Sequence, residues 1–436
     1  MRALKFAKYL PEYGWRAVVL TAWPEDCYFR HEFQQDPGLL LEIEGLAAVH
    51  QVRSPLEYRA RCIRAKQKAL SKKLDAMLFG RSKDTANGVF GGPRGLGRFQ
   101  GIRVHQDQSA LWNPFAYRAA RKLVFKEDID AILTTSPPHL VHLVGYCLRL
   151  QTGIPWVADF RDGWCGNPVF TAASAVRRRV DQKLERRVVG RADAVVVVTN
   201  HMLEHFQRSY PERSGVFHLI RNGFDPADFV GRMSLPREPV TTFVHVGNLG
   251  GFRNPGYVVR AFDELVAEGC FGPMDVKLVF VGANYGDGSA LASNLVELVP
   301  PVNHSKAIEY MMSADVLLLV AGAEEGPAAM TSKVFEYLAS RRPILAAIPA
   351  GGELAQLLSS LSHCVVVPPN DLRRIKEGIL EMRMMLRAGV DGGGCDREVI
   401  AGCDRRVLTG RLADLLNLLV SRGDRSGGLA SRLPSR

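Results

Sequence analysis

Short apolar runs recur along the chain, and they are continuous rather than alternating. Six lie in the first half: 17–21 (AVVLT), 47–52 (AAVHQV), 130–136 (DAILTTS), 156–160 (WVADF), 194–199 (AVVVVT) and 216–220 (VFHLI). Six more follow: 242–247 (TFVHVG), 276–282 (VKLVFVG), 295–299 (LVELV), 316–321 (VLLLVA), 343–348 (PILAAI) and 364–368 (CVVVP). Continuous Val, Ile and Leu are typical of strands buried on both faces of a parallel sheet. Because segments with helical periodicity separate most runs, the pattern predicts an α/β protein with two tandem Rossmann-like, doubly wound domains.

The two series of runs set the expected domain boundaries. The first domain is expected at 1–222 and the second at 223–398, because NGFDPADF and the proline-bearing LPREP follow the last run of the first series. A C-terminal helix is expected at 399–421 and a disordered tail, rich in Arg and Gly, at 422–436. Ligands of such domains bind beyond the carboxyl ends of the strands, so we expect the two domains to face a shared cleft.

The chain begins on a helix rather than on a strand. Residues 2–10 (RALKFAKYL) form an amphipathic helical pattern that ends at Pro11 and Gly14, and the first predicted strand comes afterwards. A doubly wound domain usually opens with a strand and a glycine-rich turn that lead into this helix. We therefore expect the N-terminal domain to lack its first strand, as a start codon assigned too far downstream would produce, with neighbouring strands left unpaired.

The net charge of +11 is unevenly distributed among the 436 residues. Residues 53–103 hold 13 Lys or Arg against three acidic residues, and residues 399–436 hold seven Arg against three Asp. The rest of the chain is close to neutral, which argues against a nucleic-acid-binding face. Within this basic insertion, residues 59–79 form a basic amphipathic pattern that suits either an anionic membrane surface or packing on the first domain. The glycine-rich residues 80–101 are predicted to form a surface loop, since neither a strand nor a helix start flanks them.

The cysteines and the apolar runs indicate the compartment. The eight cysteines are scattered, with no C-x-x-C pair and no Cys/His set at zinc spacing, so we expect buried thiols and no metal site. No run has the roughly 18 apolar residues that a membrane span needs, and the N-terminus does not have the pattern of a secretory signal. The expected location is the cytoplasm, with the alternative of a peripheral position on the inner face of the membrane.

Charged side chains follow a predicted strand of the first domain. Asp159, Arg161 and Asp162 lie at the end of the run 156–160, and the SPP sequence at 136–138 ends the preceding run. A guanidinium beside two carboxylates competes with a metal ion for them. We therefore expect a structural role for Asp159 and a cleft role for Asp162.

In the second domain, glycine-rich turns and a lysine follow predicted strands. Gly247 lies in a strand, turn and helix pattern in which backbone amides can approach an anion, and Arg253 adds charge there. Lys333 lies at the start of a predicted helix, where the helix dipole disfavours a cation unless an anion such as a diphosphate neutralises it. Glu336, one turn later, suits a bidentate bond to a pair of ribose hydroxyls. The alternative is an intrahelical Lys333–Glu336 ion pair.

Seven segments together resemble the GT-B fold glycosyltransferases of the group 1, family 4 type. They are SPPHLVHLVG, GIPWVADFRDGW, RADAVVVVTNHM, IRNGFDP, HVGNLGGFRNP, SADVLLLVA and TSKVFEYLASRRPILA, in this order. The subgroup resembled includes enzymes of bacterial surface-polysaccharide biosynthesis. The resemblance implies transfer of a sugar from a nucleotide diphosphate sugar, with retention, to a sugar or lipid-linked acceptor.

The resemblance also implies roles for particular residues. Glu336 matches the glutamate that holds the donor ribose, Lys333 and Arg253 match positions that neutralise the diphosphate, and the turn at Gly247 approaches the donor phosphates. Such enzymes need no metal cofactor. The acceptor hydroxyl is expected near two catalytic candidates, which are Asp162 and His139.

Two departures from the family pattern keep other functions open. The E-x7-E pattern of the family places its first glutamate where this chain has Ala328, with Glu324 and Glu325 out of register. The first strand and its glycine-rich acceptor loop are also missing. The alternatives are a GT-B sugar-nucleotide 2-epimerase and a non-catalytic GT-B-like scaffold subunit.

Overall fold

The computed structural model describes most of the chain. The described residues are 1–23, 36, 38–55, 108–165, 174–231, 240–249, 253–272, 274–282, 291–328, 330–390 and 397–425. The amphipathic segment 59–79, the glycine-rich stretch 80–101 and residues 426–436 of the expected tail therefore lie outside the described residues. Residues 422–425, also expected in the disordered tail, are helical instead. None of the helices in the described part of the chain combines the length and the apolar character that crossing a bilayer requires.

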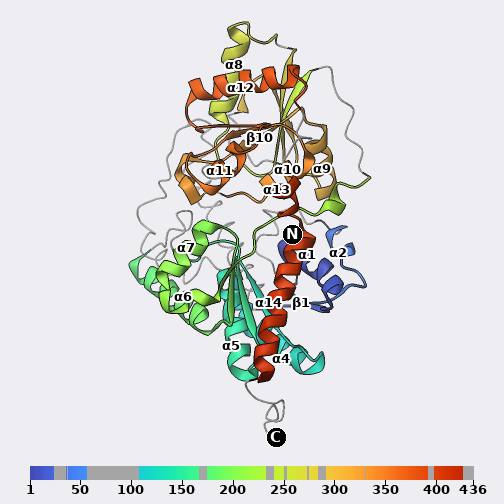
Figure 1. Cartoon of the computed structure of the whole chain (residues 1–436), viewed down its shortest axis with the longest axis vertical. Helices are drawn as coiled ribbons and strands as arrows, with labels where there is room; N and C mark the ends of the chain where they lie inside the picture. Colours follow the sequence, from blue (N-terminus) through green and yellow to red (C-terminus); the bar gives the residue numbers. More distant parts are fainter. Residues whose placement is uncertain are drawn as a thin grey trace, which may run out of the picture.

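The second series of apolar runs forms one parallel sheet with the strand order β12-β11-β10-β7-β8-β9. Its strands are β7 (Thr241–Val246), β8 (Val276–Val281), β9 (Val296–Val299), β10 (Val316–Val320), β11 (Ile344–Ala347) and β12 (Cys364–Val367). Two helices cover one face and three cover the other (Figure 1): α8 (Gly256–Ala267) and α12 (Leu372–Arg387), then α9 (His304–Ser313), α10 (Lys333–Ser340) and α11 (Glu353–Ser359). All six strands predicted in this half are confirmed.

The first series of runs also forms strands, but in two separate parallel sheets. One sheet pairs β1 (Ala17–Ala22) with β2 (Ala47–Val52). The other has the order β3 (Ile132–Ser136), β4 (Trp156–Phe160), β5 (Ala194–Val197) and β6 (Phe217–Leu219). Leu20 and Val52 still pack against the same hydrophobic cluster as Trp156, so both sheets belong to one domain. Among the described strands, none pairs with both β1 and β3, so the two sheets remain separate.

Helices cover both faces of the β3–β6 sheet. They are α4 (Asn113–Lys126), α5 (His142–Thr152), α6 (Ala175–Arg191) and α7 (Asn200–Ser209) on one face, and α1 (Arg2–Tyr9) and α14 (Arg405–Arg425) on the other. The remaining helices include α2 (Gly38–Leu41) and α13 (Arg397–Ala401). Helix α14 runs back from the second domain and lies beside α1 (Figure 1). Its Leu408, Leu412 and Leu416 pack against Phe6 and Val157, so the chain end completes the core of the first domain.

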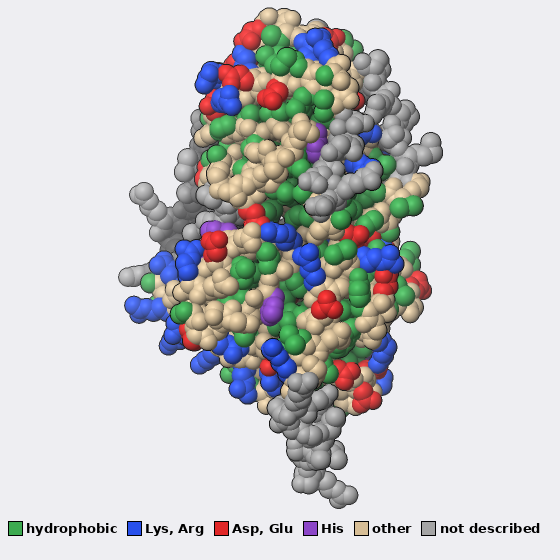
Figure 2. All heavy atoms as spheres, viewed as in Figure 1, with side chains coloured by type: hydrophobic (Ala, Val, Ile, Leu, Met, Phe, Trp, Pro, Cys, Tyr) green, Lys and Arg blue, Asp and Glu red, His purple; other side chains and the backbone are tan. Residues whose placement is uncertain are grey.

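Helix α6 carries a local positive charge that the summed charge of the chain conceals. Lys and Arg side chains gather over this helix (Figure 2). Its exposed basic residues are Arg178, Arg179, Lys183, Arg186, Arg187 and Arg191. Val176 and Val180 are exposed beside them. The charge distribution along the chain predicted basic surface only in the insertion and the tail. The structure shows a further basic surface on α6.

Two chain segments cross between the domains side by side at the hinge. The amide of Phe224 donates to the carbonyl of Cys403 (3.0 Å), and the amide of Arg405 donates to the carbonyl of Phe224 (2.8 Å). A Cβ at Gly223 would lie 1.9 Å from the Cys403 carbonyl oxygen, so only glycine permits this approach. The domains are thus joined by a paired backbone rather than by a single linker.

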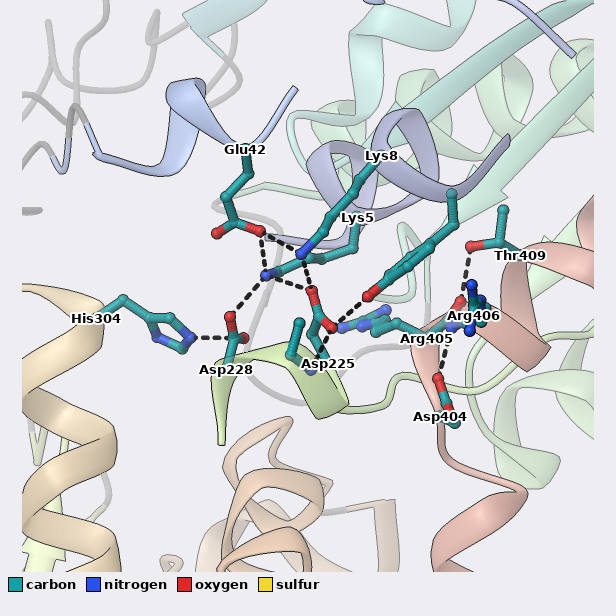
Figure 3. Close-up of polar contacts among 12 residues, drawn as sticks. Lys5, Lys8, Glu42, Asp225, Asp228, His304, Asp404, Arg405, Arg406 and Thr409 are labelled. Atoms are coloured by element: carbon teal, nitrogen blue, oxygen red, sulfur yellow. Dashed lines mark hydrogen bonds and ion pairs between the residues drawn. The ribbon is translucent and has the colours of Figure 1, made fainter. Parts of the chain in front are cut away.

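A cluster of buried charges surrounds this hinge (Figure 3). The Nζ atom of Lys5 lies 2.7 Å from Asp225, 3.0 Å from Asp228 and 2.6 Å from Glu42. Lys8 binds Asp225 (2.7 Å) and Glu42 (2.9 Å). The three carboxylates are close enough to hold a metal ion, but the two ammonium groups occupy that space. The amphipathic helix α1 predicted at 2–10 is therefore confirmed, while part of its polar face is buried rather than hydrated.

The cluster reaches the second domain through His304 of α9. Its Nε2 lies 3.0 Å from Asp228, and its amide donates to Asp36 (2.9 Å). Burial opposes ionisation of Asp225, but hydrogen bonds from Lys5 and Lys8 outweigh it and lower the pKa of Asp225 to about 2. On the other flank, Glu353 of α11 accepts from the amide of Asn200 at the start of α7 (2.8 Å) and pairs with Arg221. Charged contacts therefore join the domains on both sides of the hinge.

Replacing Asp225 should reveal the contribution of this cluster. Asp225→Asn leaves two buried ammonium groups short of a counter-charge, and we expect a loss of about 3 to 5 kcal/mol in the free energy of unfolding. Because the folded pKa of Asp225 is depressed, the stabilisation is complete above the ordinary Asp pKa and is lost as the pH falls toward about 2. Urea unfolding measures both effects. Glu377→Gln, which breaks exposed pairs on α12, is the control and should change little.

Candidate functional site

A cleft of about 1020 Å³ lies between the two domains. One wall comes from the loop after β4, which carries Arg161 and Asp162, and the other from the turns after β7 and β8 and the start of α10. The predicted location at the carboxyl ends of the strands is confirmed. Four of the predicted site residues line this cleft: Asp162, Gly247, Arg253 and Lys333.

Gly247 and Lys333 are in direct contact. Gly247 has φ +118°, and a Cβ built on it would lie 2.0 Å from the Nζ atom of Lys333. Its amide donates to the carbonyl of Val281 (2.7 Å), which fixes the turn against β8. Glycine is therefore required here both by the backbone conformation and by the lysine above it.

Lys333 is the first residue of α10, where the backbone amides have no hydrogen-bond acceptor within the helix. Its ammonium makes no ion pair within the described residues, and Ser332 before it provides no side-chain cap. Burial and the nearby Arg253 lower the pKa of Lys333 to about 8. A cation held half-buried at a helix N-terminus, without a counter-ion, is a setting that an anion would stabilise.

Arg253 has a carboxylate partner on the same wall. It donates to both oxygens of Glu325 (3.0 and 3.2 Å), and Glu325 also accepts from the amide of Gly322 (3.1 Å). Glu325 belongs to the short helix η10 (Ala323–Ala328), which occupies the segment where the family pattern has its first glutamate. In this chain the out-of-register Glu325 holds Arg253 at the cleft.

Glu336 lies one turn along α10 and does not line the cleft. It is half-buried, and it makes no hydrogen bond or ion pair with any described residue. Burial raises the pKa of Glu336, while His304 and Arg405 favour its charged form. The alternative of an intrahelical ion pair with Lys333 is therefore wrong, since the two groups interact only at a distance.

On the first-domain wall, Asp159 is structural. Both of its oxygens accept from Arg2, at 3.0 to 3.2 Å, and Thr135 donates to it (2.8 Å). Arg161 donates to the carbonyls of Ser136 (3.0 Å) and Pro137 (2.7 Å) and so holds the turn after β3. The structural role expected for Asp159 is confirmed.

Asp162 faces the opposite wall across the cleft. Burial raises the pKa of its carboxyl, and the charges of Arg161 and of Arg253 from the second domain oppose the shift. A carboxyl whose pKa is raised accepts a proton more readily than an exposed one. The arrangement thus places a candidate proton acceptor opposite the Lys333 side of the cleft.

His139 lies outside the residues that line the cleft. It begins the short helix η6 (His139–Val141), its ring stacks on Trp164 at 5.5 Å, and its Nδ1 is 3.1 Å from the Ser136 hydroxyl. Its catalytic role stays a prediction. The fold also brings to the cleft His304 and Arg405, which the sequence pattern did not single out. His304 begins the helix that follows β9 and could have been found by the same strand-end rule, whereas Arg405 begins α14, far along the chain from the last strand.

The fold and the cleft define the class of protein: two Rossmann-like α/β domains facing each other, which is the GT-B fold. Residues 68–228 match the family model described as Glycosyltransferase Family 4. The resemblance to GT-B glycosyltransferases of the group 1, family 4 type is confirmed. A sequence search among curated proteins finds no match.

Solved structures are similar to the chain over most of its length. Sucrose-phosphate synthase from Thermosynechococcus elongatus is 15% identical, with 93% of this chain and 100% of that chain covered and a TM-score of 0.60. Anabaena HepE, determined in complex with UDP and glucose, is 13% identical, with 95% and 94% covered and a TM-score of 0.57. A trehalose-phosphate synthase from Burkholderia xenovorans is 13% identical, with 72% and 79% covered and a TM-score of 0.53. At these identities the likeness establishes the shared fold.

Inorganic pyrophosphate should bind at Lys333 and raise its pKa. At a pH of about 8.5, free Lys333 is mostly neutral, so anion binding is expected to take up a proton. Calorimetry in two buffers of different ionisation enthalpy measures this uptake. Lys333→Met should abolish it, whereas Lys183→Met, on the exposed face of α6, should not. Equal proton uptake by wild type and Lys333→Met would contradict the assignment.

Proposed function

We propose that the protein is a retaining glycosyltransferase that moves a sugar from a nucleotide diphosphate sugar to an acceptor hydroxyl. The observation that carries the proposal is the position of Lys333: an ammonium with no counter-ion among the described residues, in contact with Gly247, at the start of a helix that lines the interdomain cleft. This setting suits a diphosphate. The match of residues 68–228 to glycosyltransferase family 4 supports the same activity.

In the proposed reaction, the bond between the anomeric carbon and the diphosphate oxygen breaks, and the leaving diphosphate takes the electron pair. Lys333, Arg253 and the amides at the start of α10 stabilise the charge that develops on it. The acceptor hydroxyl attacks the anomeric carbon from the face that the diphosphate leaves, so the configuration is retained. The hydroxyl proton passes to a departing phosphate oxygen, with Asp162 and His139 proposed to position the acceptor.

The same cations support a reaction without a resident metal. In metal-dependent transfer, a divalent ion neutralises the leaving diphosphate. Here Lys333 supplies positive charge on the cleft wall, and Arg253, which Glu325 holds in place, lines the same wall. We propose that these side chains, together with the helix N-terminus, replace the ion.

The acceptor and location are proposed to follow the subgroup that the chain resembles. This places the enzyme in cell-surface polysaccharide or glycoconjugate biosynthesis, at the cytoplasmic face of a membrane, with a sugar or lipid-linked acceptor. The exposed basic side chains of α6 support this placement, because they suit anionic lipid headgroups.

Nucleotide binding tests the donor site. Calorimetric titration with UDP, GDP and ADP should find one that binds, and Glu336→Gln should weaken it about tenfold or more, because a ribose hydroxyl loses a charged acceptor. Glu381→Gln, on the exposed face of α12, is the matched control and should bind as wild type does. If none of the three nucleotides binds, or if Glu336→Gln binds unchanged, the proposed function is wrong.

Product analysis tests the reaction. A screen of nucleotide sugars and acceptors, followed by mass spectrometry, should detect a glycosylated acceptor together with the nucleoside diphosphate. The anomeric proton coupling of the product should match that of the donor. Release of an epimerised donor sugar nucleotide without transfer would instead identify an epimerase.

A further inference from the structure

Arg405 places a guanidinium at the hinge end of the cleft. It is the first residue of α14, and its backbone amide is fixed by the carbonyl of Phe224 in the paired crossover. Its side chain lines the cleft and is only 4% exposed. The return of the chain to the first domain therefore carries a buried cation into the space between the domains (Figure 3).

This guanidinium has unused hydrogen-bonding capacity. It donates no side-chain hydrogen bond to any described residue, and its Nη1 is shielded from solvent as well. The other buried cations at the hinge differ, since Arg2 binds Asp159 and Lys5 binds Asp225. A buried charge without a partner is costly, and such a cost is retained where a ligand supplies the partner.

Glu336 is the complementary group. It too makes no hydrogen bond with a described residue, and the charge of Arg405 favours its ionised form. The two side chains form no ion pair with each other, although Arg405 is buried and Glu336 is half-buried. Lys333 and Arg405 both line the cleft, and both interact electrostatically with Glu336.

This charge arrangement matches a nucleoside diphosphate. The doubly charged diphosphate suits Lys333, while a neutral ribose suits the pair Glu336 and Arg405, because each ribose hydroxyl is both a donor and an acceptor. A hydroxyl can donate to the carboxylate while its oxygen accepts from the guanidinium. The carboxylate of Glu336 would be repelled by the diphosphate, so this side chain favours the ribose end of the ligand.

We propose that Arg405 is a donor-binding residue whose guanidinium donates hydrogen bonds to the ribose hydroxyl oxygens of the nucleotide, opposite Glu336. The inference rests on the proposed function and adds a contact from the helix that covers the first domain. The donor is thus held from both sides of the hinge, by α10 of the second domain and by the start of α14.

The test uses the full chain and whichever of UDP, GDP or ADP binds to it. Arg405→Met keeps the apolar stem and removes the donors, and we expect an affinity about tenfold or more weaker. Arg405→Lys keeps the positive charge but not the planar guanidinium, so its affinity for the nucleotide should lie between those of wild type and Arg405→Met. Arg411→Met, on the exposed side of the same helix, should stay within about twofold of wild type, as a surface substitution does.

A second measurement separates a hydroxyl contact from a general electrostatic effect. Wild type should prefer the ribonucleotide over its 2′-deoxy analogue, and Arg405→Met should lose part of that preference. The melting temperature of the unliganded Arg405→Met variant should not fall, because the change removes an unpaired buried charge. If the melting temperature of Arg405→Met does fall, Arg405→Lys is used instead to compare the affinities for the ribonucleotide and its 2′-deoxy analogue.

The outcomes distinguish the inference from the proposed function. Weakened binding in Glu336→Gln with unchanged binding in Arg405→Met overturns the role of Arg405 and leaves the function standing. An unchanged preference for the ribonucleotide in both Arg405 variants also overturns it. Absence of nucleotide binding by wild type overturns both.

Discussion

Burial of charge at the hinge is the constraint on which the rest of the structure depends. Lys5 of α1 is buried and Lys8 is partly buried, so both need Asp225, Asp228 and Glu42 close by. Those carboxylates lie on the interdomain linker and directly after α2. Meeting this need fixes α1 against the linker, and His304 then extends the contact to α9. The cleft between the domains takes its shape from these joined elements.

Three other charges lack such partners. Arg2, Lys5 and Lys8 at the hinge pair with carboxylates, whereas Lys333 and Arg405 of the cleft lining and Glu336 of α10 make no ion pair within the described residues. Burial disfavours the charged form of all three: it lowers the pKa of Lys333 and Arg405 and raises that of Glu336. A stable fold retains such groups at a cost, and a ligand that carries phosphates and hydroxyls can offset that cost. The contrast between paired and unpaired charge separates the scaffold from the site.

The local sequence pattern predicted the strands and four of the residues that line the cleft, but it missed the position of His139 and the basic surface of α6. Continuous apolar runs predicted all twelve strands, and residues after strand ends predicted that Asp162, Gly247, Arg253 and Lys333 would line the cleft. His139 was harder to place, because whether a residue near a strand end points into the cleft or stacks behind it, as on Trp164, depends on packing partners. The positive surface of α6 was concealed by summing charge over long stretches.

The sequence by itself determined the twelve strands and their parallel α/β arrangement, because strands buried on both faces consist of consecutive apolar residues. The separation of β1 and β2 from the β3–β6 sheet appears only in the structure. It also placed Gly247 in a turn after a strand, but the requirement for glycine there follows from its φ of +118° and from the contact with Lys333. Only the tertiary structure decided that Arg2 and Lys5 are buried and that Arg405 enters the cleft. The physical reason is distance along the chain: Arg405 reaches the site because α14 crosses back to cover the first domain, and no local pattern encodes that crossing.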